Sequence, residues 1–287
     1  MYDSLFCRVY NEFGWNEYPR AFGEALLEWL RQRGISPRTA LDLGCGTGAL
    51  CETLREQGME TLGIDLSADM IAVARRRSPG LDYRVGDMTD FEPPHPFDLV
   101  TCTGDALNHV TDPAGIERVF VHARAALGPG GLFVFDLLRE EEVPPSEPFE
   151  ADFSDRLRVR FTVNREPDHM ITLQIEGFEG DEPKFIERIR ERIYDISEIL
   201  GMLRGADFEI LQCADHLLPG QDAHGTTWFV IAQKIQDEGN CSGRPNKLKF
   251  IGETGGEGTG IILKDLLRCE EQGTGIVAAA LKSQCLQ

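Results

Sequence analysis

The stretch LDLGCGTGAL, residues 41–50, decides how this sequence folds, because it joins an apolar run to three closely spaced glycines and then to a helical pattern. Gly44, Gly46 and Gly48 have no Cβ, so the chain can turn sharply at these positions and a ligand can approach the backbone closely. The stretch therefore predicts a strand, a glycine-rich turn that serves as a binding site, and a helix.

The same alternation of strand and helix continues on both sides of this turn. Apolar runs that predict strands lie at 39–44, 59–65, 81–87, 97–102 and 131–137. Helical patterns lie between them at 48–58, 67–77 and 112–130. Ser67 and Asp112 are suited to cap the last two helices, and Pro113 fits a first helical position. Short connections between alternating strands and helices predict a parallel sheet with right-handed crossovers.

The pattern changes after residue 137. Apolar and polar residues alternate at 156–164, 170–180 and 184–195, which predicts antiparallel strands with one face in water. A helix at 197–207 and two further strands at 208–213 and 226–234 follow. We therefore expect four parts: an N-terminal helical lid at 1–38, an α/β core at 39–137 and 196–235, an antiparallel insertion at 138–195 over the mouth of the parallel sheet, and a glycine-rich extension at 236–287.

Two acidic residues follow the glycine-rich turn at the ends of successive predicted strands. Asp65 ends the second strand, 21 residues after Gly44, where a carboxylate can accept hydrogen bonds from both hydroxyls of a ribose. Asp87 ends the third strand, at the level where an adenine would lie. The turn and the two acids together predict a site for a cofactor that contains adenosine.

Residues 39–137 resemble the class I S-adenosylmethionine-dependent methyltransferases. LDLGCGTG is similar to the first motif of that family, Asp65 to its ribose-binding acid, and GDM at 86–88 to its adenine-side motif. The resemblance implies a Rossmann-like α/β fold with a seven-stranded sheet, mostly parallel, whose last strand is antiparallel. The segment 226–234 is the predicted last strand. S-adenosyl-L-methionine is the expected cofactor, and its expected contacts are Tyr18, Gly44, Gly46, Gly48, Asp65, Leu66, Asp87, Met88 and Thr103.

The small-molecule branch of the family is the nearer relative, since its members carry aromatic residues near the N-terminus and antiparallel strands after the fifth strand. Tyr10 is the expected contact for the sulfonium, which a ring face or a hydroxyl attracts. Its alternative role is that of an apolar lid residue. His109, in the segment after the fourth strand, is the expected partner of the methyl acceptor, with a backbone-satisfied helix residue as the alternative. Tyr10 and His109 are therefore the candidate catalytic residues.

The expected reaction is an in-line displacement by a nitrogen or oxygen nucleophile of a small molecule. Because the sulfonium is already activated, the protein mainly has to align the reactants and exclude water. The six histidines form no HxH or HxxxH cluster, so no metal is expected. Arg156, Arg158, Arg160 and Arg165 either bind an acidic group of the acceptor or form the wet face of a strand.

Two other functions stay open on sequence grounds. Gly44, Gly46 and Ala49 also satisfy the relaxed dinucleotide fingerprint, so an NAD-dependent reductase is one alternative, although no second nucleotide-binding half follows. The other alternative is a non-catalytic module that binds S-adenosylmethionine, because methyl transfer requires no diagnostic residue.

Composition limits the partners and the location. The net charge of −19 argues against nucleic acid as a partner, because such proteins neutralise phosphates with basic residues. No run of 18 apolar residues occurs, so no membrane segment is expected. Eight cysteines without a CxxC pair suggest reduced thiols of a cytoplasmic protein. A homodimer is compatible with all of this.

Overall fold

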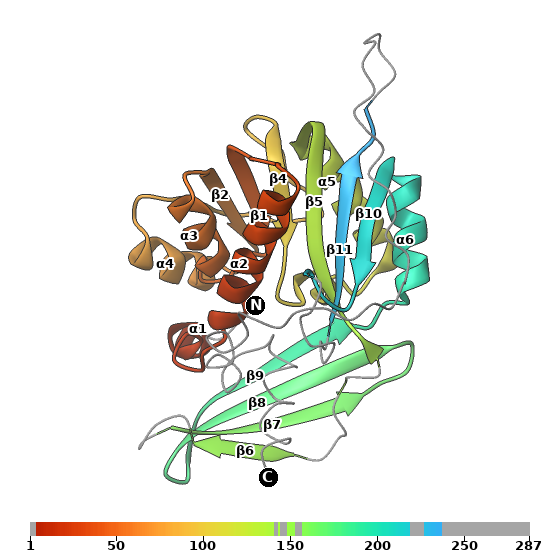
Figure 1. Ribbon diagram of the computed structural model, residues 1–287. Coiled ribbons are helices and arrows are strands. Elements are labelled where there is room, and N and C mark those ends of the chain that lie inside the picture. The colour runs from red at the N-terminus through yellow and green to blue at the C-terminus, as the bar shows by residue number, and fades with distance from the viewer. Residues whose placement is uncertain (1–3, 141–142, 144–147, 153–156, 219–226, 237–287) are drawn as a thin grey trace, which may run out of the picture.

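The computed structural model describes residues 4–140, 143, 148–152, 157–218 and 227–236, and contains two β-sheets. The larger sheet has seven strands in the order β10-β11-β5-β4-β1-β2-β3 (Figure 1). Its strands are β1 (Thr39–Leu43), β2 (Glu60–Asp65), β3 (Asp82–Val85), β4 (Phe97–Cys102), β5 (Leu127–Leu138), β10 (Phe208–Ala214) and β11 (Thr227–Lys234). All neighbouring strands are parallel except β11, which is antiparallel to both β5 and β10. The predicted fold, with its antiparallel last strand, is confirmed.

Helices cover both faces of this sheet, which makes three layers. On one face, α2 (Glu17–Gln32) and α3 (Ala49–Glu56) pack on alternate residues of the strands, and α4 (Ala68–Arg77) packs beside α3. On the other face lie α5 (Pro113–Ala126) and α6 (Ile196–Gly205). The strands between them are buried on both sides, as is typical of parallel sheets. The segment 1–38 is predicted to be a helical lid, but its helix α2 packs into the core.

The junction between α5 and β5 differs from the prediction of a helix over 112–130. The helix starts as expected, with the Asp112 side chain accepting a hydrogen bond from the Ala114 N–H and Pro113 in the first turn. It ends at Ala126, because Leu127 is extended and pairs with Phe97 as the first residue of β5. Pro129 has no N–H to donate, and Gly130 has a φ of 72°, so the helix cannot continue through them.

The second sheet is the predicted insertion. It contains β6 (Phe149–Asp152), β7 (Arg158–Arg165), β8 (Met170–Glu179) and β9 (Glu182–Arg192), paired antiparallel in chain order. β6 was not predicted, because it lies in a connection rich in proline and glutamate; its Phe149 ring stacks on Phe161 at 4.8 Å. Figure 1 shows this sheet across the carboxyl ends of the parallel strands, with the N-terminal helix α1 (Ser4–Val9) beside it.

Hydrogen bonds from the core fasten the insertion at its base. Asn108 belongs to a single 3-10 turn, η1 (Ala106–His109), and is fully buried. Its Nδ2 donates to the carbonyl of Arg192 at 2.8 Å, and its Oδ1 accepts from the Leu138 N–H at 3.2 Å. The Tyr194 hydroxyl donates to the carbonyl of Val110. The end of β9 and the residues after it are therefore tied to the chain on both sides of His109.

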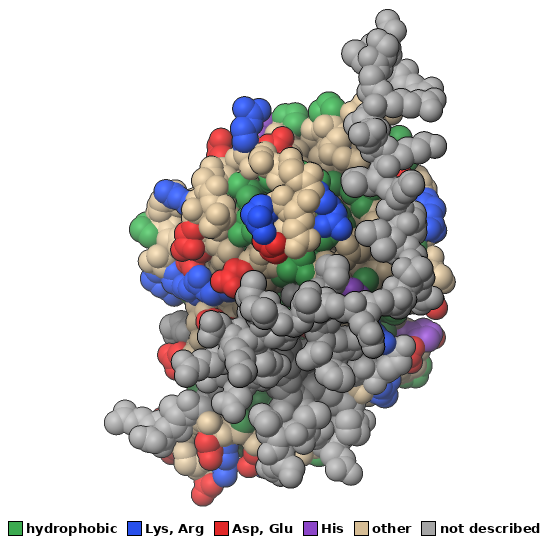
Figure 2. Space-filling view, in the orientation of Figure 1, with side chains coloured by type: hydrophobic (Ala, Val, Ile, Leu, Met, Phe, Trp, Pro, Cys, Tyr) green, Lys and Arg blue, Asp and Glu red, His purple; other side chains and the backbone are tan. Residues whose placement is uncertain are grey.

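On the face drawn in Figure 2, acidic side chains are interspersed with the basic ones among the described residues. Of the basic run at 75–77, Arg75 donates to the carbonyl of Tyr83 and Arg77 pairs with Glu52. Among the described helices, none is long and apolar enough to span a membrane. Arg156 and residues 237–287 of the predicted extension lie outside the described residues.

Replacing Asn108 with alanine should loosen the insertion. The substitution leaves the Leu138 N–H and the Arg192 carbonyl without a partner in a buried position, which costs about 2–4 kcal/mol in total. Urea unfolding measures the loss, and Asn164→Ala, on an exposed position of β7, is the matched control. Equal free energies of unfolding for the two variants would contradict the role of Asn108 in docking.

Candidate active site

A cavity of about 650 Å³ lies at the carboxyl ends of the parallel strands, between the core and the insertion. This is where open α/β sheets bind their ligands, and the volume suits a small-molecule site. Nine of the eleven predicted site residues line it, namely Tyr10, Gly44, Gly46, Asp65, Leu66, Asp87, Met88, Thr103 and His109. The sequence therefore located the cavity, although Gly48 and Tyr18 do not line it.

The glycine-rich turn forms the floor of the cavity. The N–H groups of Gly44 and Cys45 both donate to the carbonyl of Ile64, at 2.8 and 3.0 Å, which fixes the turn to the end of β2. Gly44 has a φ of 71°, and a Cβ there would lie 2.7 Å from the Cβ of Ala106. Gly48 has a φ of 84°, and a Cβ there would overlap the hydroxyl of Tyr83. Both positions thus require glycine.

Asp65 joins the turn to the next loop. Its Oδ2 accepts a hydrogen bond from the Gly46 N–H and its Oδ1 from the Ser67 N–H, both at 2.8 Å. Burial raises the pKa of Asp65, and the two N–H groups oppose that rise. The next residue, Leu66, is 65% exposed beside the same cavity.

Asp87 and Met88 line the cavity from the turn after β3. β3 ends at Val85, so Asp87 lies just beyond the strand that was predicted to end with it. One of its oxygens accepts hydrogen bonds from the N–H and the hydroxyl of Thr89, both at 2.8 Å. This local turn holds the Asp87 carboxylate at the rim.

Tyr10 lies in an aromatic cluster at the N-terminal side of the cavity. Its ring meets those of Trp15 and Phe6 edge to face, with centroids 5.1 and 5.9 Å apart. Burial and the charges of Asp105 and Asp65 raise the pKa of the phenol, so it stays protonated. A neutral ring and hydroxyl are what a sulfonium contact needs.

The loop after β4 is held by a carboxylate of β5. The N–H groups of Gly104 and Asp105 donate to the two oxygens of Asp136, each at 3.0 Å, and the Tyr18 hydroxyl donates to the same group. Burial raises the pKa of Asp136 to about 6. Tyr18 is not among the residues that line the cavity, but it helps to hold the loop that contains Thr103, which does. Contact between Tyr18 and a cofactor stays a prediction.

His109 reaches the cavity from η1, and 28% of its side chain remains exposed. Burial lowers its pKa to about 4, so the imidazole is neutral at pH 7 and free of the proton that a base must accept. Its Nε2 lies 3.6 Å from Oε1 of Glu191. Asp105, His109 and Glu191 each offer one ligand atom within 4.8 Å of the others, so the expectation of no metal site stays untested.

Sequence reasoning missed several residues of the cavity. Asp42 lines it, accepts a hydrogen bond from the Thr101 hydroxyl at 2.7 Å, and has a pKa raised by burial to about 7. Its signal was a charged residue inside the apolar run of β1. Glu187 and Ile189 reach the cavity from β9. The alternation of apolar and polar residues along β9 shows that these two share a buried face, but it does not show that this face contacts the cavity.

Of the four arginines singled out in the sequence, the three described ones (Arg158, Arg160 and Arg165) do not line the cavity, whereas Arg188 and Arg190 of β9 do. Arg160 pairs with Glu150 at 2.6 Å, and Arg165 donates to the carbonyl of Val143 at 3.0 Å. Arg158 also lies near Glu150, at 3.8 Å. The side chains of these three arginines are thus engaged with other partners, and Arg158 and Arg160 lie on the face of β7 opposite to its buried residues.

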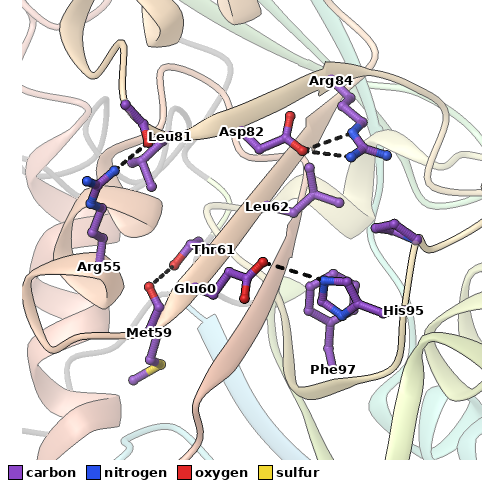
Figure 3. A pocket seen from close by; sticks show the side chains of 12 residues that line it. Arg55, Met59, Glu60, Thr61, Leu62, Leu81, Asp82, Arg84, His95 and Phe97 are labelled. Carbon is purple, nitrogen blue, oxygen red and sulfur yellow. Dashed lines mark hydrogen bonds and ion pairs between the residues drawn. The ribbon is translucent and has the colours of Figure 1, made fainter.

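A second cavity of about 440 Å³ lies beside the edge strand β3, away from the glycine-rich turn (Figure 3). Its charged side chains already have partners, since Arg84 pairs with Asp82 at 2.7 Å and His95 lies 3.9 Å from Glu60. None of the predicted site residues lines it. The cavity at the glycine-rich turn is therefore the candidate active site.

Comparison with known proteins identifies the kind of domain that contains this cavity. Residues 40–131 match the model of a methyltransferase domain. A relative from Geobacillus sp. (strain WCH70), named as a methyltransferase, is 26% identical over 79% of this chain and 96% of its own length. The dTDP-4-amino-2,3,4,6-tetradeoxy-D-glucose N,N-dimethyltransferase of Saccharopolyspora spinosa is 32% identical, but over only 39% of this chain and 45% of that relative.

The solved structures agree with the sequence matches. A crystal structure of an S-adenosylmethionine-dependent methyltransferase from Clostridium acetobutylicum ATCC 824 superposes with a TM-score of 0.67 at 25% identity, over 74% of this chain and 90% of that one. These findings favour the methyltransferase over the reductase alternative. The chain is an S-adenosylmethionine-dependent methyltransferase, with its methyltransferase domain at residues 40–131.

Proposed function

We propose that this methyltransferase transfers the methyl group to a nitrogen or oxygen of a small molecule that binds between the core and the insertion. The observation that carries the proposal is that one cavity holds the glycine-rich turn with Asp65 on one side and Tyr10 and His109 on the other. Such a cavity suits an adenosine-bearing donor and a small acceptor together. The similarity to an amino-sugar N,N-dimethyltransferase supports an acceptor of this size.

The cofactor half of the proposal assigns one group of residues to each part of S-adenosylmethionine. Asp65 accepts hydrogen bonds from the ribose hydroxyls, Asp87 and Met88 border the adenine, and the turn at 44–48 lies along the backbone side. Thr103 lies toward the methionine half. Asp65 can serve the ribose while it braces the turn, because a carboxylate has about four acceptor positions and two are in use.

For the acceptor, the proposal is that the segment from α1 to Asn16 excludes water from the reactants. Thr47, in the glycine-rich turn, donates its hydroxyl hydrogen to Oδ1 of Asn11 at 2.8 Å, which connects this segment to the cofactor site. Asn16 and Pro19 also line the cavity. Closing over the reactants aligns them, which supplies much of the rate acceleration of a displacement.

Location follows from thiol chemistry. The five described cysteines, Cys7, Cys45, Cys51, Cys102 and Cys213, are all free. Free buried thiols suit a reducing compartment, so we infer a cytoplasmic enzyme. The net charge of −19 supports an acceptor other than nucleic acid.

Asp65→Ala should weaken the binding of S-adenosylmethionine by about 100- to 10,000-fold, since the two hydrogen bonds from the ribose to this charged group contribute about 1.5–3 kcal/mol each. Titration calorimetry with S-adenosylmethionine, S-adenosylhomocysteine and NAD(H) measures it. Asp82→Ala, on an exposed carboxylate of β3, is the control and should bind like the wild type. Binding of NAD(H) alone would overturn the cofactor assignment.

The roles of the ring and the hydroxyl of Tyr10 can be tested separately. If the ring face contacts the sulfonium, Tyr10→Leu weakens S-adenosylmethionine about 3- to 30-fold more than the uncharged S-adenosylhomocysteine, because only the first is a cation. Tyr10→Phe keeps the ring and should bind both like the wild type. Equal losses for the two ligands in Tyr10→Leu would assign Tyr10 the role of an apolar lid residue.

His109→Ala should lower turnover by about 100-fold and leave S-adenosylmethionine binding unchanged, as expected for the loss of a general base. Transfer from labelled cofactor to a panel of small amines, carboxylates and phenols measures turnover. His95→Ala, in the second cavity, is the control (Figure 3). Turnover equal to that of the wild type would remove His109 from the mechanism, and absence of transfer to every acceptor would favour a non-catalytic binding module.

A further inference from the structure

Glu191 is a buried carboxylate that the proposed mechanism has not used. It lies near the end of β9 and is 0% exposed. Within the described part of the chain, neither of its side-chain oxygens accepts a hydrogen bond. An ionised carboxylate in such a place is costly unless a positive group faces it. Its nearest ionisable neighbour with a positive form is His109, whose Nε2 lies 3.6 Å from Oε1.

The backbone around the two side chains fixes their approach. Asn108, just before His109, is bonded to Arg192, and Val110, just after it, accepts from Tyr194. These bonds join η1 to the end of β9 on both sides of the pair, so His109 and Glu191 meet where the core and the insertion are most firmly connected. His109 lines the cavity, whereas Glu191 is not among the lining residues and lies behind it.

Several charged groups lie around the pair. Asp105 faces it from the loop before η1, Tyr10 from the N-terminal segment, and Glu187 from the same buried face of β9. Arg188 and Arg190 alternate with the glutamates along β9, bond to Gln174 and Glu166, and are also among the residues that line the cavity. Acidic neighbours favour a positive charge on the imidazole, whereas burial opposes it and lowers the pKa of His109.

Burial shifts the pKa values of the two groups in opposite directions, each toward the neutral form. Burial lowers the pKa of His109 to about 4 and raises that of Glu191 to about 8. Because the two groups face each other, they titrate as a pair, which takes up one proton as the pH falls through about 8. Above that pH the pair is free to accept a proton, so a base that depends on it works better as the pH rises.

We propose that Glu191 is the positioning residue for His109: it orients the imidazole toward the acceptor and stabilises the positive charge that His109 gains with the acceptor's proton. The inference rests on the proposed role of His109 as the base. An electron pair of the acceptor forms the bond to the methyl carbon, and the carbon–sulfur bond breaks with its electrons going to sulfur. The proton of the acceptor's N–H or O–H moves to His109, which becomes an imidazolium beside the Glu191 carboxylate.

Histidine titration by NMR tests this without any acceptor. The full chain, labelled with ¹⁵N-histidine and saturated with S-adenosylhomocysteine, is titrated from pH 4 to 10, and His109→Ala identifies the His109 signals. The wild type should show a step in the His109 shifts near pH 8. Glu191→Gln removes that step, because the variant has no carboxyl group to take up the proton. Glu191→Asp, which keeps the charge, should retain the step.

A control and three outcomes decide the matter. Glu176→Gln, on the neighbouring strand β8 where Glu176 faces Arg160, should titrate like the wild type, and thermal melting verifies that each variant is folded. A wild type without the step, or the same step in Glu191→Gln, would overturn the proposal. So would stoichiometric Zn²⁺ binding at His109 that Glu191→Gln abolishes, because Glu191 would then be a metal ligand. Because this titration measures no methyl transfer, it can refute the role of Glu191 whatever the turnover assay shows for the proposed function.

Discussion

The site depends on one half-buried carboxylate that accepts two backbone hydrogen bonds. Asp65, at the end of β2, binds the N–H of Gly46 from the loop after β1 and the N–H of Ser67 from its own loop. Each loop leads into a helix, α3 or α4, so a single side chain sets where two helices begin relative to the sheet. The two hydrogen bonds favour the ionised form against the cost of burial, and the same charge is left facing the cavity.

The second requirement is that the core and the insertion meet at a fixed position. The insertion has its own apolar face, which packs on the aromatic residues of the N-terminal segment. Nonpolar packing of this kind is non-directional and tolerates small shifts, whereas the hydrogen bonds of Asn108 and Tyr194 do not. The polar contacts therefore provide the accuracy that alignment of two reactants demands, and the apolar contacts provide the stability.

Sequence predicts those parts of the molecule whose determinants are local. The glycine-rich turn, Asp65 and the period of each strand are encoded within a few residues, and they place nine of the predicted residues at the cavity. The start of β5 was missed because its residues Gly128 to Gly130 resemble a helix end, while their pairing partner lies about 30 residues earlier in the chain. Asp42 and Glu191 were missed for a related reason: their burial against the site depends on tertiary packing, which a sequence pattern does not contain.

The insertion leaves the core at Leu138 and returns to it at Tyr194, and both points lie beside Asn108 and Val110. A module whose entry and exit are adjacent can be lengthened, shortened or exchanged while the order of the seven strands stays the same. If the core recognises the donor and β9 helps to recognise the acceptor, as proposed, these two functions can diverge at different rates during evolution. Under the role proposed for Glu191, an exchange of the whole module keeps the chemistry only when its last strand again presents an acidic side chain behind residue 109, which is a strict criterion for anyone who recombines such enzymes.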